Sequence, residues 1–281
     1  MGISNKKVLV RGAGDIASGI IWSLAYAGFK VVASEVEKPS SIRTSVSFSD
    51  AIFDGTKIID GLKAVYAKSI KEVIDIIECD NVAIYVDRNA DILKDIKFDI
   101  VVDAIMAKKN VGTKIDMAEV VIGVGPGFTA KVDCHYAVET MRGHKLSYIY
   151  EDGSPLPDTG IPGLIATHGA DRVLHSPCDG IFKNVHKIGD VVSKGTVLSR
   201  IEEEVNGKAT GNIVELCASI DGVLRGILKD GFYAKKGLKA ADIDPRIEER
   251  ENAFTISDKS RAVGNAVVCA IIHELNKKDI V

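Results

Sequence analysis

The chain has 281 residues, 46% of them apolar, which is enough for one large or two ordinary domains with buried cores. A formal net charge of -3 gives no electrostatic reason to expect nucleic acid or an anionic membrane as a partner. No apolar run approaches the ~20 residues of a membrane span, and the N-terminus lacks the apolar core of a signal peptide, so the sequence predicts a cytoplasmic protein.

Residues 7–35 have the pattern of a βαβ unit. An apolar run enters a turn rich in glycine, a helical pattern follows, and a second apolar run ends at Glu35. The turn has the spacing G-x-G-x-x-A. Gly12 can adopt a backbone shape closed to other residues, Gly14 lets the backbone approach a diphosphate, and Ala17 lets the helix pack closely on the strand.

This unit predicts a site for a small phosphate-bearing ligand. A helix that begins at the turn directs unpaired N–H groups and the positive end of its dipole at an anion. Glu35 follows at the distance, about 20 residues, where a carboxylate binds a ribose hydroxyl pair. The alternative is a turn that packs a helix on a sheet and binds nothing. The predicted ligand contacts here are Gly12, Ala13, Gly14, Asp15, Ala17 and Glu35.

Basic and polar side chains follow at two later points. Arg43 lies just past the second strand, where it could meet a phosphate on the ribose or an anionic substrate group, or lie on the surface. A helix over 69–79 and strands over 82–86 and 100–105 come next.

Lys108, Lys109 and Asn110 then fall past the carboxyl end of a central strand, where open α/β sheets bind ligands. Solvated surface charge is the alternative for the lysines. We predict Arg43, Lys108 and Asn110 as binding residues and Lys109 as a catalytic candidate.

The densest group of reactive side chains follows a strand at 120–124. Gly125 and Gly127 flank a proline and form a loop, which we predict approaches the ligand. His135 and Glu139 are four residues apart, so on a helix they share a face and could chelate a metal or relay a proton.

Arg142 could bind a phosphate or carboxylate through two parallel hydrogen bonds from its guanidinium. We predict His135, Glu139 and Arg142 as catalytic candidates. A helix whose polar side carries these residues by chance is the alternative, and no metal ligand set is assigned.

An internal repeat occupies the next part of the chain. Residues 176–201 align with residues 218–243 at a constant offset of 42, with D-G and K-G pairs in register. This pairing of short apolar strands resembles the barrel-sandwich fold of lipoyl and biotinyl domains. Lys208, in the turn where such domains carry their attachment lysine, lacks the expected flanking residues and is interpreted as a surface lysine.

A final helix is predicted after the cap residue Ser257, with one apolar stripe and lysines at its end. The predicted fold class is α/β: a Rossmann-like parallel sheet domain over 1–168 and a small all-β barrel-sandwich (lipoyl/biotinyl-like) domain over 169–246. A third part, 247–281, is a C-terminal helix that packs back on the first domain.

The five cysteines are single and odd in number, so no zinc cluster or disulfide framework is indicated. Most are expected to be small buried apolar side chains.

The chain resembles, over nearly its whole length, the family described as selenium-dependent molybdenum hydroxylase system proteins, distant relatives of the xanthine dehydrogenase accessory protein. The segments that carry the resemblance are RGAGDIASG, VDAIMAKKN, GPGFTA, VETMRGH, DTGIPG, GVLRG and DIDPR. The resemblance implies an accessory role in the maturation of a molybdenum hydroxylase, with the hydroxylase apoenzyme as partner and selenium, sulfur or the molybdopterin cofactor as cargo.

Two positions depart from the family pattern. Members have an aliphatic or similar residue where this chain has Cys134, which argues against an essential thiol, and asparagine where it has Asp158.

Two further functions stay open. One is an NAD(P)-dependent oxidoreductase with Glu35 on the ribose and His135 or Lys109 as the proton donor, although no dehydrogenase catalytic signature is present. The other is a non-catalytic scaffold whose β domain docks the hydroxylase. The candidate cofactors are NAD(P), another nucleotide or the molybdopterin cofactor. The sequence does not decide whether a reaction is catalysed or whether the chain forms a homo-oligomer.

Overall fold

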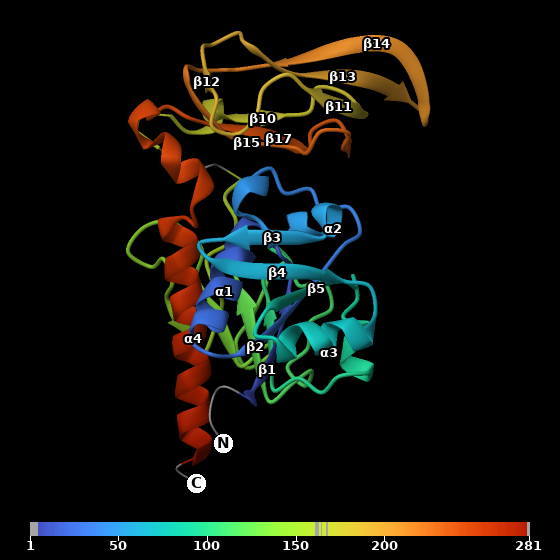
Figure 1. The fold of residues 1–281 in the computed structure, drawn as a ribbon. Helices are drawn as coiled ribbons and strands as arrows, with labels where there is room; N and C mark the ends of the chain where they lie inside the picture. The colour runs from blue at the N-terminus through green and yellow to red at the C-terminus, as the bar shows by residue number, and fades with distance from the viewer. Residues whose placement is uncertain (1–4, 161–162, 164, 167, 280–281) are drawn as a thin grey trace. The chain divides into compact units, whose positions relative to one another are not determined.

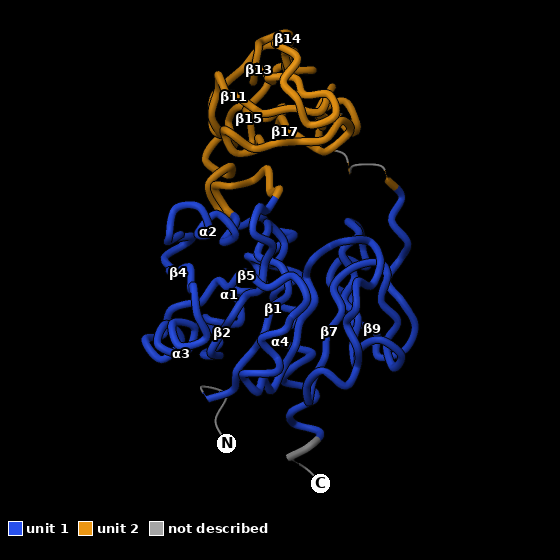
Figure 2. The backbone as a smooth tube through the Cα atoms, turned by 90° about the vertical axis from the view of Figure 1, so that its right-hand side faces the viewer, with its two compact units in different colours: residues 1–39, 47–159, 256–281 blue, residues 40–46, 160–255 orange. Residues whose placement is uncertain are grey.

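The computed structural model describes residues 5–160, 163, 165, 166 and 168–279. The chain divides into two compact units, which Figure 2 shows in different colours. Unit 1 comprises residues 1–39, 47–159 and 256–281, and unit 2 comprises residues 40–46 and 160–255.

Unit 1 is built on a nine-stranded sheet with the order β3-β4-β5-β2-β1-β6-β7-β8-β9. All neighbours from β4 to β8 are parallel, whereas β3 is antiparallel to β4 and β9 is antiparallel to β8. The strands are β1 (Lys7–Arg11), β2 (Lys30–Glu35), β3 (Thr56–Ile59), β4 (Leu62–Ala67), β5 (Val82–Val86), β6 (Ile100–Asp103), β7 (Val120–Val124), β8 (Tyr136–Val138) and β9 (Ile149–Tyr150).

Helices cover both faces of this sheet (Figure 1). Successive strand residues point to opposite faces, so Val8 and Val10 pack with α1 and α4 while Leu9 packs with α3. The central strands are therefore almost continuously apolar, as expected for a sheet buried on both sides. The helices and helical turns of unit 1 are α1 (Asp15–Tyr26), η3 (Phe48–Asp50), α2 (Ala51–Asp54), α3 (Ile70–Glu78), η4 (Asp91–Lys94) and α4 (Asp258–Asp279). The helical turns η2 (Thr44–Val46), η5 (Ala170–Arg172) and η6 (Ile247–Phe254) belong to unit 2.

Helices α1 and α4 pack unusually closely. A Cβ added at Gly264 would lie 2.5 Å from the carbonyl oxygen of Gly19, and one added at Gly19 would lie 2.4 Å from the carbonyl oxygen of Ser260. Ser23, further along α1, meets Asn265 on α4. The two helices therefore run in the same direction, and both begin at the carboxyl edge of the sheet.

The start of α4 is capped as predicted, because the Ser257 hydroxyl oxygen accepts a hydrogen bond from the Ser260 N–H at 3.1 Å. Even α4, with 22 residues the longest helix that the structure describes, lacks the apolar length needed to cross a membrane.

Unit 2 consists of two four-stranded sheets whose pairings are all antiparallel, with the orders β10-β17-β15-β12 and β14-β13-β11-β16. The strands are β10 (Val173–His175), β11 (Gly180–Asn184), β12 (Val191–Val192), β13 (Val197–Val205), β14 (Lys208–Cys217), β15 (Gly222–Ile227), β16 (Tyr233–Ala234) and β17 (Lys239–Asp244).

The two copies of the sequence repeat exchange equivalent hydrogen bonds. The Lys194 N–H donates to Asp221 Oδ1 at 2.7 Å, and the Lys236 N–H donates to Asp179 Oδ1 at 2.7 Å. Each aspartate thus caps the K-G turn of the other copy, so neither copy completes its turns alone.

The fold class predicted from the sequence is wrong. The large sheet is mixed rather than parallel, because β3 and β9 at its edges run antiparallel to their neighbours. Residues predicted to form a lipoyl-like barrel-sandwich domain form two four-stranded antiparallel sheets. The antiparallel direction of these edge strands was not predicted, because the direction of a strand depends on the neighbour with which it pairs, and the local pattern of apolar residues does not show that neighbour.

We predict that Gly264→Ala destabilises the protein. Alanine normally favours a helix interior over glycine by about 1 kcal/mol, but here its methyl group would meet α1, and such overpacking costs about 1–3 kcal/mol. Urea denaturation measures the change. Asn276→Ala, at an exposed position of the same helix, is the control, and equal stability of both variants would contradict the close packing.

Candidate functional site

The turn between β1 and α1 is packed against β2 and against the residue after β6, and its Gly14 side borders open space. The Gly12 N–H donates to the Ser34 carbonyl at 2.7 Å, which fixes the turn to β2. Gly12 has a φ of +97°, and a Cβ there would lie 2.9 Å from the Ala104 carbonyl oxygen. Gly14 has an ordinary φ of -74°, and a Cβ added to it would meet nothing within 4 Å. Gly14 therefore borders open space.

Glu35 ties the end of β2 to this turn. Its Oε2 accepts a hydrogen bond from the Ala13 N–H at 2.9 Å, and its Oε1 accepts one from the Val36 N–H at 2.8 Å. Burial raises the pKa of the Glu35 carboxyl, and these two hydrogen bonds act in the opposite direction. A carboxylate has about four acceptor positions, so both oxygens keep capacity for a ligand hydroxyl.

The turn lies at the point where the strand order reverses. From β1 the chain proceeds first to β2 on one side and later to β6 on the other. Open α/β sheets bind ligands at the carboxyl ends of the strands beside such a point. The predicted residues Gly12, Ala13, Gly14 and Asp15 are therefore at a place suited to ligand binding.

The start of α4 borders the same turn. The Ser260 hydroxyl donates to Asp15 Oδ1 at 3.0 Å, which joins the first turns of α4 and α1. Lys259 precedes Ser260 and is half-buried. Burial lowers the pKa of its ammonium and the nearby Arg142 lowers it further, while Asp15, Glu139 and Asp258 raise it.

Sequence reasoning missed Lys259. It stands 245 residues after Gly14 in the chain, and the only signal was its place in the first turn after the predicted cap.

Arg142 does not face the turn as a free cation. Its two terminal nitrogens bind both carboxylate oxygens of Asp258, at 3.0 and 3.1 Å. The pair joins the segment after β8 to the first residue of α4. We therefore assign Arg142 a part in positioning α4.

Glu139 is completely buried, and its carboxylate is saturated by the chain around it. Oε1 accepts the N–H groups of Thr140 and Met141, each at 2.7 Å. Oε2 accepts the Leu156 N–H at 2.7 Å and the Tyr150 hydroxyl at 3.4 Å. These bonds fold the segment from β8 to residue 156 around one buried charge, which indicates a structural role.

His135 and Glu139 flank the strand β8, so the expectation that they share a helix face is wrong. The His135 Nδ1 accepts the Val121 N–H at 2.9 Å, and the His135 N–H donates to the Val121 carbonyl at 2.8 Å. The ring thus continues the pairing of β8 with β7. Within the part of the chain that the structure describes, no group of three or more His, Cys, Asp or Glu residues is placed to hold a metal.

The loop after β6 contains the predicted Lys108, Lys109 and Asn110. The Lys108 ammonium pairs with Asp158 at 2.7 Å, and Lys109 is exposed. The Asn110 side-chain oxygen accepts the N–H groups of Gly112 and Thr113, so it organises the loop itself.

The glycines of the predicted binding loop serve close packing. A Cβ on Gly127, where φ is +103°, would lie 2.4 Å from the Cα atom of Lys109. A Cβ on Gly125, where φ is +83°, would lie 3.0 Å from the hydroxyl oxygen of Thr140. Ala17, on the buried face of α1, likewise serves packing.

Arg43 belongs to unit 2, whereas the glycine turn belongs to unit 1. Its side chain is buried, and a guanidinium nitrogen donates to the Asn252 carbonyl at 3.2 Å.

A buried ion pair immediately precedes the turn and was not foreseen. Arg11, the last residue of β1, donates to Asp103 Oδ2 at 3.0 Å and to the hydroxyl oxygen of Thr113. The Thr113 hydroxyl donates to the same Asp103 oxygen at 2.5 Å. All three residues are almost fully buried. This cluster locks the carboxyl ends of β1 and β6 together.

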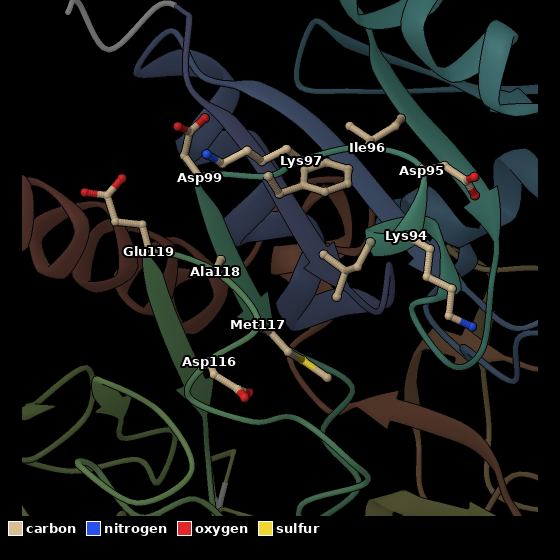
Figure 3. A pocket seen from close by; sticks show the side chains of 11 residues that line it. Lys94, Asp95, Ile96, Lys97, Asp99, Asp116, Met117, Ala118 and Glu119 are labelled. Atoms are coloured by element: carbon tan, nitrogen blue, oxygen red, sulfur yellow. The ribbon is translucent and has the colours of Figure 1, made fainter.

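A groove of about 760 Å³ lies at the other edge of the sheet (Figure 3). It is lined by residues 93–99 and 116–119. Asp99 and Glu119 immediately precede β6 and β7, so the groove borders the amino ends of these strands. None of the predicted site residues lines it.

Comparison with known proteins gives one close sequence relative. The chain is 43% identical over 266 residues to an Escherichia coli (strain K12) protein described as "Uncharacterized protein YqeB". The match covers 94% of this chain and 47% of the relative, so the chain spans about half the relative's length. No protein-family model matches the chain.

Solved structures match the chain only at low sequence identity and low TM-score. The ectoine utilization protein EutE of Ruegeria pomeroyi is 12% identical, with a TM-score of 0.26 and 85% of each chain covered. A succinylglutamate desuccinylase/aspartoacylase of Rhodobacter sphaeroides is 14% identical with a TM-score of 0.28, and an aspartoacylase family protein of Mesorhizobium loti is 13% identical with a TM-score of 0.31; 85% of each chain is covered in both comparisons. At these scores no activity is transferred from them.

These findings overturn the resemblance stated above. The structures are described as desuccinylase, aspartoacylase and ectoine-utilization proteins, and neither they nor the curated relative carries a description that names molybdenum or selenium. The predicted membership in the selenium-dependent molybdenum hydroxylase system family, and the accessory function with its alternatives, are therefore wrong.

We predict that Cys134 is inert to thiol reagents in the folded protein. Its side chain is fully buried, and burial raises its pKa to about 12, so the reactive thiolate is absent near neutral pH. Cys79 and Cys269 are exposed and serve as internal controls. Iodoacetamide at pH 8 followed by mass spectrometry should modify the controls first, and labelling of Cys134 at the same rate would contradict its burial.

We predict that Glu139→Ala destabilises the protein by at least about 2 kcal/mol, because it leaves three backbone N–H donors without their acceptor. Thermal and urea denaturation measure the loss. Glu78→Ala, at an exposed position at the end of α3, should change stability by less than about 0.5 kcal/mol. A Glu139→Ala variant as stable as this control would contradict the structural role of Glu139.

Proposed function

We propose that unit 1 binds a small phosphate-bearing ligand at the turn between β1 and α1, with the phosphate over Gly14 and the first N–H groups of α1. The observation that carries the proposal is the open space in front of Gly14. A glycine with ordinary backbone angles and no neighbour for its missing side chain leaves room for another molecule.

Two further features support a nucleotide as the class of ligand. The positive end of the α1 dipole is directed at the turn, as in phosphate sites at helix N-termini. Glu35 is held beside the turn by the Ala13 N–H and keeps acceptor capacity, which suits a ribose hydroxyl pair. A phosphate at the turn and a diol at Glu35 together describe a ribonucleotide.

Each part of the site contacts a different part of the proposed ligand. The turn and the start of α1 bind the phosphate through backbone N–H groups, and Glu35 orients the sugar. Lys108, Lys109, Asn110 and the loop at Gly125 and Gly127 border the same edge of the sheet, where they would enclose the rest of the ligand.

We predict that Gly14→Val lowers the affinity for ADP at least about tenfold, because the new side chain occupies the phosphate position. The fold should survive, with a loss of about 1 kcal/mol or less from the poorer cap, since the Cβ meets no neighbour. Isothermal titration calorimetry with ADP, NAD+ and inorganic diphosphate measures binding, and thermal denaturation reports folding.

Gly12→Ala would be a poorer test, because its Cβ would press on the Ala104 carbonyl oxygen and strain the backbone itself. Equal ADP affinity of wild type and Gly14→Val would show that ADP does not bind at the turn. Failure of the wild type to bind any of these three compounds would contradict the proposed function.

A further inference from the structure

We propose that the Lys259 ammonium is the second contact of the bound phosphate, facing it across the glycine turn from the start of α4. The inference rests on the proposed function, since it assigns a further residue to that same site. It identifies a group that neither the glycine pattern nor the comparisons point to.

The backbone position of Lys259 is fixed by the contacts of the neighbouring Ser260. Ser260 donates its hydroxyl to Asp15, the first residue of α1, at 3.0 Å. The Ser260 carbonyl oxygen lies where a side chain on Gly19 would otherwise be. These contacts hold the first turn of α4 against the first turn of α1, one residue from Gly14.

The charges around Lys259 come from three elements. Asp15 lies on α1, Glu139 and Arg142 follow β8, and Asp258 precedes Lys259 on α4. Each has other partners: Asp15 accepts from Ser260, Glu139 accepts backbone N–H groups, and Arg142 and Asp258 bind each other. Among the described residues, no hydrogen bond or ion pair within 4.0 Å occupies the Lys259 ammonium.

A partly buried ammonium without a close partner is costly, because burial removes water that would otherwise stabilise the charge. An anion at the turn would supply that partner. Helices α1 and α4 both begin at this edge, so the positive ends of two dipoles add to the attraction for the same anion. The site therefore fits a doubly charged phosphate or diphosphate group better than a carboxylate with one charge.

The experiment uses ADP for affinity and pyridoxal 5′-phosphate as a reporter on the full chain. The phosphate of the reporter should bind at the turn, and its aldehyde should condense with the Lys259 amine, releasing water. Borohydride then reduces the imine to a stable amine, which peptide mass spectrometry locates. Its lowered pKa makes the Lys259 amine more nucleophilic at neutral pH than exposed lysines.

We expect Lys259→Gln to weaken ADP binding about tenfold or more relative to wild type. Lys259→Arg should keep most of the wild-type ADP affinity but form no adduct with pyridoxal 5′-phosphate at position 259. Lys71→Gln is the matched control, because Lys71 is the second residue of α3 as Lys259 is of α4, and it is exposed. ADP and the Gly14→Val substitution should both suppress labelling of Lys259, and pyridoxal without phosphate should label it poorly.

The outcomes distinguish the two proposals. Lys259→Gln with wild-type affinity, together with loss of binding in Gly14→Val, would overturn this inference and leave the proposed function intact. Labelling of Lys259 at the rate of Lys71, or unaffected by ADP, would also overturn it. A wild-type protein that binds neither ADP nor the reporter would overturn both.

Discussion

The contact between α1 and α4 through Gly19 and Gly264 is the constraint on which the carboxyl edge of unit 1 depends. Two parallel helices approach so closely only where neither carries a side chain at the crossing. The contact brings residues 259–264 beside residues 15–23, although more than two hundred positions separate them. A chain without it would keep the glycine turn but lose the wall that α4 forms beside it.

The rest of this edge is fixed by charges that the chain satisfies internally. Arg11 and Asp103 join β1 to β6, and Arg142 and Asp258 join the segment after β8 to α4. Buried ionic groups are costly when single and tolerable when paired and hydrogen-bonded. Their function here is to hold strand ends and a helix start in one arrangement, so that the backbone N–H groups of the turn keep their direction without help from a ligand.

The sequence predicted what depends on neighbouring residues. The first βαβ unit, the strands at 82–86 and 120–124 and the helix after Ser257 follow from local periodicity and caps, and the structure has them at or near the predicted bounds. The segment around His135 was misread because residues spaced by four suit a helix, whereas the partner that decides its strand, Val121, is distant in sequence. Lys259 could not be assigned at all, since only tertiary packing places it at the turn.

Glu35 and Glu139 show why residue type alone does not identify a binding group. Both lie at the carboxyl end of a strand, Glu35 as the last residue of β2 and Glu139 directly after β8, and both accept backbone N–H groups. Glu139 receives three backbone N–H groups and the Tyr150 hydroxyl, and it is completely enclosed, so nothing remains for a ligand. Glu35 receives two N–H groups and is only partly buried beside the open face of Gly14. The difference is acceptor capacity: a saturated carboxylate stabilises the fold, and a carboxylate with lone pairs left over at an open turn can bind another molecule.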